Sequence, residues 1–140
     1  MPTHFDTLIT GARIVDGSGN PWIRADVAIT GDRISAITPP GQISPRQAAV
    51  VISPGGDRIV CPGFIDMHVH FRGGEQLAKE NKDFLKLFLS YGITTVRDAG
   101  GDITPQLLSW KKDIESGKLE GPRIFTSGPK LDGKDPAWEG

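Results

Sequence analysis

Residues 62–70 read PGFIDMHVH, a β-prone run that follows a Pro-Gly pair and ends with two histidines. Successive side chains of a strand point to opposite faces. One face of a strand over residues 64–70 is apolar and consists of Ile65, Met67 and Val69. The other face becomes polar toward the carboxyl end and consists of Phe64, Asp66, His68 and His70. We expect the apolar face to pack against helices and the polar face to present both imidazoles.

The two histidines form a candidate metal clamp. Residues at positions i and i+2 on one strand face can direct their ring nitrogens toward a single ion, and neutral imidazole is a common ligand of zinc and similar divalent metals. In a parallel α/β barrel the carboxyl ends of the strands carry the active site. The spacing therefore favours His68 and His70 as metal ligands. A His-x-His pair by itself is weak evidence, and the alternative is two ordinary polar residues at a strand end.

Residues 5–60 predict a small β segment made of short strands broken by turns. The expected strands are 5–10, 12–15, 26–30, 33–37, 50–52 and 58–60. The pair Gly31-Asp32 separates two alternating runs, and glycine tolerates the positive φ of a tight turn. The segment 26–37 is therefore expected to form a β-hairpin.

From residue 64 onward β-rich runs alternate with amphipathic segments. The expected strands are 64–70, 93–98 and 123–126, and helices are expected over 75–91 and from Thr104 to Gly117. Thr104 is expected to be the N-cap with proline at the first helical position, and the glycine to end the helix. One face of this second helix carries Leu107, Trp110 and Ile114. The βαβαβ pattern predicts an α/β fold with a parallel sheet.

Composition and charge exclude several classes of protein. The 140 residues are 37% hydrophobic and 24% charged, which is typical of a globular domain and not of a disordered chain. A net charge of −1 gives no reason to expect a nucleic-acid or membrane partner. The single cysteine, Cys61, excludes an internal disulfide, and the chain shows neither a signal peptide nor a membrane span. We expect a cytoplasmic protein.

The motifs resemble those of the amidohydrolase superfamily, the urease-related metal-dependent hydrolases. Residues 62–70 look like the first-strand signature of that family, and the β segment before them looks like its amino-terminal sandwich piece. The run GITTVRDAGG at 92–101 is similar to the second strand of imidazolonepropionase-like and prolidase-like members. The run PRIFTSGP at 122–129 resembles their third strand. The resemblance covers nearly the whole chain, and the motifs follow the family order and spacing.

The resemblance implies a fold and a metal site. Residues 62–140 would be the first three strands and two helices of an incomplete (β/α)8 TIM-type barrel, after a small β-sandwich-like segment over 1–61. His68 and His70 would be ligands of a divalent metal, zinc above all, in a site with one or two ions. A lysine or glutamate, two further histidines and a general-base aspartate would follow beyond residue 140. Because such a barrel needs about 250 residues, we expect this chain to be a fragment.

The resemblance also implies an activity. The expected reaction is metal-dependent hydrolysis of a carbon–nitrogen bond other than an internal peptide bond, in a small-molecule substrate such as a cyclic amide, an N-acyl amino acid or a dipeptide. A deaminase reaction belongs to the same superfamily. Asp98, at the end of the second barrel strand, is the candidate substrate-binding residue, and the alternative for it is an ion pair or a helix-capping contact.

The fragment itself is expected to be inactive, because it holds two ligands and no general base. The rival hypothesis is a non-enzymatic binding or assembly module that keeps the front of the fold. Assembly into a homo-oligomer is compatible with either hypothesis.

Overall fold

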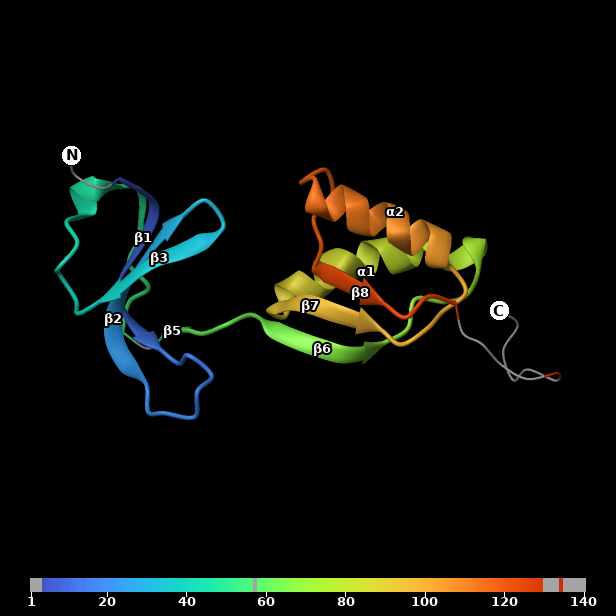
Figure 1. The fold of residues 1–140 in the computed structure, drawn as a ribbon, viewed down its shortest axis with the longest axis horizontal. Helices are drawn as coiled ribbons and strands as arrows, with labels where there is room; N and C mark the ends of the chain where they lie inside the picture. The colour runs from blue at the N-terminus through green and yellow to red at the C-terminus, as the bar shows by residue number, and fades with distance from the viewer. Residues whose placement is uncertain (1–3, 57, 130–133, 135–140) are drawn as a thin grey trace. The chain divides into compact units, whose positions relative to one another are not determined.

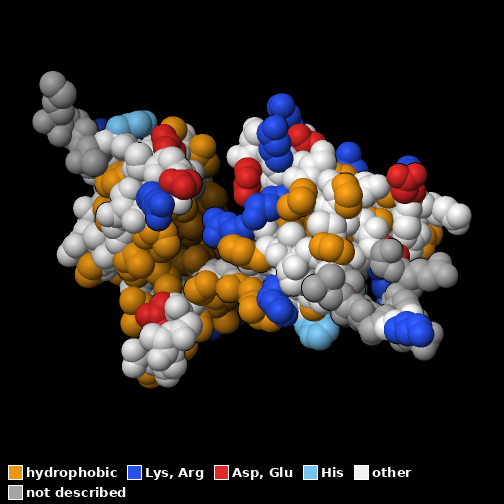
Figure 2. Space-filling model, turned by 45° about the vertical axis from the view of Figure 1, so that its right-hand side comes forward, with side chains coloured by type: hydrophobic (Ala, Val, Ile, Leu, Met, Phe, Trp, Pro, Cys, Tyr) orange, Lys and Arg blue, Asp and Glu red, His pale blue; other side chains and the backbone are white. Residues whose placement is uncertain are grey.

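The computed structural model describes residues 4–56, 58–129 and 134 (Figure 1). The chain divides into two compact units, Met1–Pro62 and Gly63–Gly140, and each of them has its own buried apolar cluster. Hydrophobic side chains are also exposed on the surface of both units (Figure 2). Ile34 and Val50 of the first unit and Phe125 of the second are each more than half exposed. Within the described ranges, no helix combines the length and hydropathy that a membrane crossing requires.

The first unit is a five-stranded sheet in the order β3-β2-β1-β4, and its last strand, β5, also pairs with β1. The elements are β1 (Phe5–Ile14), β2 (Ile23–Thr30), β3 (Arg33–Thr38), the 3-10 turn η1 (Pro45–Gln47), β4 (Ala48–Ile52) and β5 (Ile59–Val60). β2 and β3 pair antiparallel across Gly31-Asp32. The predicted hairpin is therefore confirmed.

β1 replaces the two strands predicted at 5–10 and 12–15. Its register with β2 shifts between Ile9 and Ala12, and Gly11 in the shift has a φ of +58°. Only glycine adopts this left-handed conformation readily, so the chain forms a bulge and continues as a strand. The buried carboxylate of Asp26 accepts hydrogen bonds from the backbone N–H groups of Gly11 and Gly41, both at 2.7 Å. These bonds hold the bulge in place.

The second unit is a parallel three-stranded sheet in the order β6-β7-β8. The elements are β6 (Phe64–Val69), the 3-10 turn η2 (Glu75–Leu77), α1 (Ala78–Ser90), β7 (Ile93–Asp98), α2 (Thr104–Glu115) and β8 (Arg123–Thr126). Both helices cover the same face of the sheet (Figure 1). The predicted βαβαβ order and the mixed α/β class are confirmed.

The core of the second unit lies between this sheet and its helices. It consists of Phe71, Leu85, Val96, Ile103, Leu107, Trp110 and Ile124. The predicted apolar face of α2 is confirmed, because Leu107 and Trp110 are buried and Ile114 packs against the same cluster. The core thus joins both helices to β7 and β8.

The start of α2 corrects a prediction. Its N-cap is Ile103 and not Thr104, whose hydroxyl is buried without a hydrogen-bond partner. Ile103 is 1% exposed, and burying such a side chain stabilises a fold by about 1.5–3 kcal/mol, against about 1 kcal/mol for a capping hydroxyl. Core packing of Ile103 therefore makes the helix begin one residue earlier than predicted. The first helix is corrected as well, because Glu75–Leu77 forms a 3-10 turn and α1 begins at Ala78.

Candidate metal centre

The predicted ligands, His68 and His70, lie at the carboxyl end of β6. The strand ends at Val69, so His68 is its penultimate residue and His70 follows directly after it. The pairing register with β7 shifts between Asp66 and Val69, and the Asp66 carboxylate accepts a hydrogen bond from the His68 N–H at 3.0 Å. Irregular pairing of this kind re-aims side chains at the end of a strand. Asp66 thus has a structural hydrogen-bonding role next to His68.

The same irregularity corrects the predicted alternation of the strand. Ile65 and Met67 are each 60% exposed, and only Val69 of the expected apolar face packs against the core. Asp66, and not Ile65, pairs in register with the buried Val96 of β7. A period of two holds only along a regular ladder, and the register shift interrupts this one.

The two imidazoles lie next to each other. Their Nε2 atoms are 3.2 Å apart, the ring centroids are 5.0 Å apart and the rings are inclined by 72°. Both side chains are exposed. Twice a zinc–nitrogen bond length is about 4.1 Å, so both nitrogens can reach one ion located between them. The pair fits the metal that the sequence predicts.

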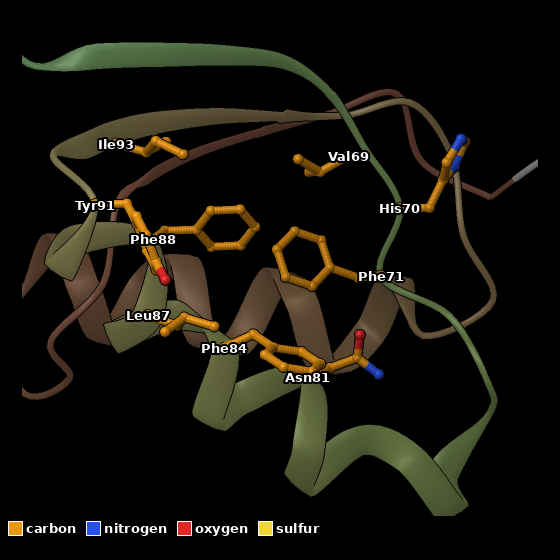
Figure 3. A pocket seen from close by; sticks show the side chains of 9 residues that line it. All are labelled: Val69, His70, Phe71, Asn81, Phe84, Leu87, Phe88, Tyr91 and Ile93. Carbon is orange, nitrogen blue, oxygen red and sulfur yellow. The ribbon is translucent and has the colours of Figure 1, made fainter.

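A backbone carbonyl selects the tautomer of the second ring. His70 Nδ1 lies 2.6 Å from the Gly100 oxygen. Because a carbonyl only accepts, Nδ1 carries the proton and donates, and Nε2 of the neutral ring keeps its lone pair. Metal-binding histidines are commonly oriented by such a bond from their other nitrogen. In Figure 3 the His70 ring points away from Phe71, whose side chain points toward Phe88.

The described residues would provide only part of a catalytic metal site. Within residues 4–56 and 58–129, no group of three or more histidine, cysteine, aspartate or glutamate side chains is placed to hold an ion. A catalytic zinc usually has three protein ligands and one open position. His68 and His70 would supply two of them, and His4 is an exposed residue of the first unit.

Asp98, the predicted substrate contact, ends β7 and is 1% exposed. One carboxylate oxygen accepts a hydrogen bond from the Phe71 N–H at 3.3 Å. The other accepts one from the Thr126 hydroxyl at 2.7 Å. These partners are neither an ion pair nor a helix cap. The substrate contact stays a prediction.

Sequence reasoning missed the contacts of the two loops that follow β6 and β7. The Asp102 carboxylate accepts hydrogen bonds from the N–H groups of Gly73 and Gly74 at 3.1 and 3.2 Å. The Asn81 amide donates to the carbonyls of Arg72 and Leu77 at 2.9 and 2.8 Å. Two glycine doublets, Gly73-Gly74 and Gly100-Gly101, were the available signal, because such pairs mark tight loops.

Similarity to known proteins covers the same region. The profile of the amidohydrolase family matches residues 59–136. The N-acyl-D-glutamate deacylase of Alcaligenes xylosoxydans xylosoxydans is 43% identical over 96 residues, which is 69% of this chain and 18% of that enzyme. Adenine deaminases also occur among the curated relatives. The chain thus spans about a fifth of the deacylase.

Two solved structures extend the likeness to the fold. A Xaa-Pro dipeptidase with methionine in its active site has a TM-score of 0.78 and 33% identity, over 89% of this chain and 34% of that one. The N-acyl-D-glutamate deacylase of Bordetella bronchiseptica, complexed with zinc and a phosphonate inhibitor, has a TM-score of 0.54 and 37% identity, over 69% of this chain and 19% of that one. Because the family profile covers more than half of the sequence and includes both candidate ligands, the chain belongs to the amidohydrolase family.

Proposed function

We propose that this chain is the front part of a metal-dependent hydrolase that acts on carbon–nitrogen bonds other than internal peptide bonds. The observation that carries the proposal is the separation of 3.2 Å between the Nε2 atoms of His68 and His70, with the second ring held by the Gly100 carbonyl. Relatives named as a deacylase, a deaminase and a dipeptidase support the reaction class.

The proposed ion is zinc or a similar divalent metal. When bound, it supplies Lewis-acid chemistry and lowers the pKa of a bound water toward neutrality. The residues of this chain orient the ligands. Gly100 holds the proton at Nδ1 of His70, and Asp66 holds the backbone of His68. The zinc in the related deacylase structure supports this assignment.

The proposed substrate is a small molecule with a hydrolysable carbon–nitrogen bond. An N-acyl amino acid is the first candidate, because the N-acyl-D-glutamate deacylase is 43% identical over 69% of the chain. Deamination is the second candidate, supported by an adenine deaminase at 40% identity over 65% of the chain. Both reactions would use the same pair of histidines.

We further propose that the βαβαβ unit is the beginning of a (β/α)8 barrel. Among the described strands, β6 pairs only with β7, so its other edge is open to a later strand. Beside this edge lies a mostly apolar pocket (Figure 3), lined by Val69, His70, Phe71, Asn81, Phe84, Leu87, Phe88, Tyr91 and Ile93. Later parts of a longer chain would close the barrel and contribute the remaining ligands and the general base.

Replacement of the histidines tests the function. In the longer protein that contains this chain, His68→Ala and His70→Ala should each lower the metal content and abolish hydrolysis, because each removes a ligand. Metal content is measured by plasma mass spectrometry and hydrolysis with N-acyl-D-amino acids. His4→Ala is the matched control, since His4 is an exposed histidine of the first unit. Full zinc content and full activity in the double variant would refute the proposal.

A further inference from the structure

We propose that the segment 98–102, anchored by the buried Asp98, positions His70. The side chain of Asp98 fixes the backbone that follows His70, and the carbonyl of Gly100 fixes its ring. In this proposal Asp98 is a positioning residue, which acts on the site through His70. The consequence for metal binding rests on the function proposed above, whereas the orientation of His70 can be measured without a metal.

The first observation is the place of the Asp98 carboxylate. It is 1% exposed, and its oxygens accept hydrogen bonds from the N–H of Phe71 and the hydroxyl of Thr126. A buried carboxylate is stable only where donors meet it, so the carboxylate and its donors determine each other's positions. Phe71 is itself 3% exposed in the core. The residue after His70 is therefore fixed through its backbone and its side chain.

The second observation is the close approach of the two loops. A Cβ atom added at Gly101 would lie 2.0 Å from the carbonyl oxygen of Phe71. The φ of Gly101 is not positive, so this position requires glycine for space and not for its conformation. Asp102 then binds the N–H groups of Gly73 and Gly74. The two loops are thus in contact at several successive residues.

These contacts act on His70 from two directions. Phe71, the residue after His70, is held by Asp98 and faces Gly101. At the ring itself, the Gly100 carbonyl oxygen accepts a hydrogen bond from Nδ1 at 2.6 Å. Because the same short segment provides each partner, a shift of Asp98 moves the backbone of His70 and the acceptor of its ring together.

The test compares two substitutions of Asp98. Asp98→Asn keeps both bonds, because its amide oxygen accepts from Phe71 and its amide nitrogen donates to the Thr126 oxygen. Asp98→Ala removes both. In the alanine variant we expect exchange of the Phe71 amide hydrogen to be faster by about tenfold or more. We also expect nitrogen NMR to show a mixture of His70 tautomers in place of the Nδ1-protonated form.

Zinc affinity and kinetics in the longer protein give an independent readout. Asp98→Ala should weaken zinc binding by about 10–100-fold, the usual effect of losing support for a metal ligand. Asp98→Asn should restore zinc affinity to near the wild-type value and leave KM unchanged. The control is Asp83→Ala, which removes an exposed carboxylate that pairs with Lys79 on α1.

The outcomes separate this inference from the proposed function. Wild-type exchange and tautomer in Asp98→Ala would overturn the inference, as would a raised KM in Asp98→Asn with unchanged zinc affinity. If Asp98 moves the tautomer but the histidine substitutions leave zinc bound, the inference stands and the proposed function fails. Should Asp98→Ala not fold, Gly101→Ala tests the contact of the same segment with the Phe71 carbonyl without a change of charge, and unchanged His70 tautomers there would overturn the inference.

Discussion

The side chain of His70 shows how neighbours orient a proposed metal ligand. An imidazole offers two nitrogens, and the hydrogen bond made by one decides which form the other takes. Here the acceptor is a main-chain carbonyl, that of Gly100. No side-chain replacement removes that acceptor directly, so the orientation of the ring depends on how the loop around Gly100 is held.

Asp66 accepts a hydrogen bond from the backbone N–H of the other proposed ligand, His68, and replacing Asp66 tests this support. Asp66→Ala removes the acceptor of the exposed His68 N–H and should lower the free energy of unfolding by about 0.5–1.5 kcal/mol. Asp66→Asn keeps an accepting oxygen and should cost less. Urea denaturation measures the first effect, and zinc titration of the longer protein measures the accompanying loss of affinity. Equal stability of the alanine variant and the wild type would contradict this role.

At the scale of the element, α2 connects the core to the loop that supports the histidines. The helix follows Ile103, which is buried directly after Asp102. The buried face of α2 therefore holds the carboxyl end of the segment 98–102 in place. The packing of a helix that contributes no ligand thus contributes to the geometry of the site.

Two adjacent leucines of α2 test this contribution. Leu107 is 1% exposed and Leu108 is 51% exposed. Leu107→Ala should lower the free energy of unfolding by about 2–5 kcal/mol, because it leaves a cavity in the core. Leu108→Ala provides the matched control and should change it by no more than about 0.5 kcal/mol. Urea denaturation monitored by circular dichroism decides, and similar losses in both variants would show that this helix face is not packed as described.

At the scale of the whole molecule, exposed apolar surface on the second unit supports the barrel proposed above. Ile65, Met67 and Phe125 are each more than half exposed on the strands of the second unit. The pocket beside α1 is likewise apolar (Figure 3). Contiguous exposed apolar surface marks sites of interaction with other protein segments, partners or ligands. The proposed barrel provides such segments.

The chain of 140 residues by itself should therefore show no hydrolase activity and should bind zinc weakly. Two imidazoles leave the ion short of the usual three protein ligands, and water must replace the rest. Isothermal titration with zinc compares this chain with the longer protein, in which affinity should rise strongly. Chelator-sensitive turnover of an N-acyl amino acid by the purified short chain would contradict the prediction.

Much of the framework was determined by local sequence. The hairpin around Gly31-Asp32, the limits of β7 and β8, and the buried face of α2 all follow from periodicity and turn residues. The histidine pair was recognisable for the same reason, because its spacing and the strand around it lie within one short run. Such signals depend on neighbours along the chain.

Tertiary structure alone decided how the candidate site is held. Asp98 meets Phe71 and Thr126 at sequence separations of 27 and 28 residues, and His70 meets Gly100 at 30. The bulge of β6 likewise required β7 as a partner, and Ile103 replaced Thr104 as the cap because the core buries it. A hydrogen bond between distant residues has no local signature, because its geometry exists only after the strands have paired and the core has packed.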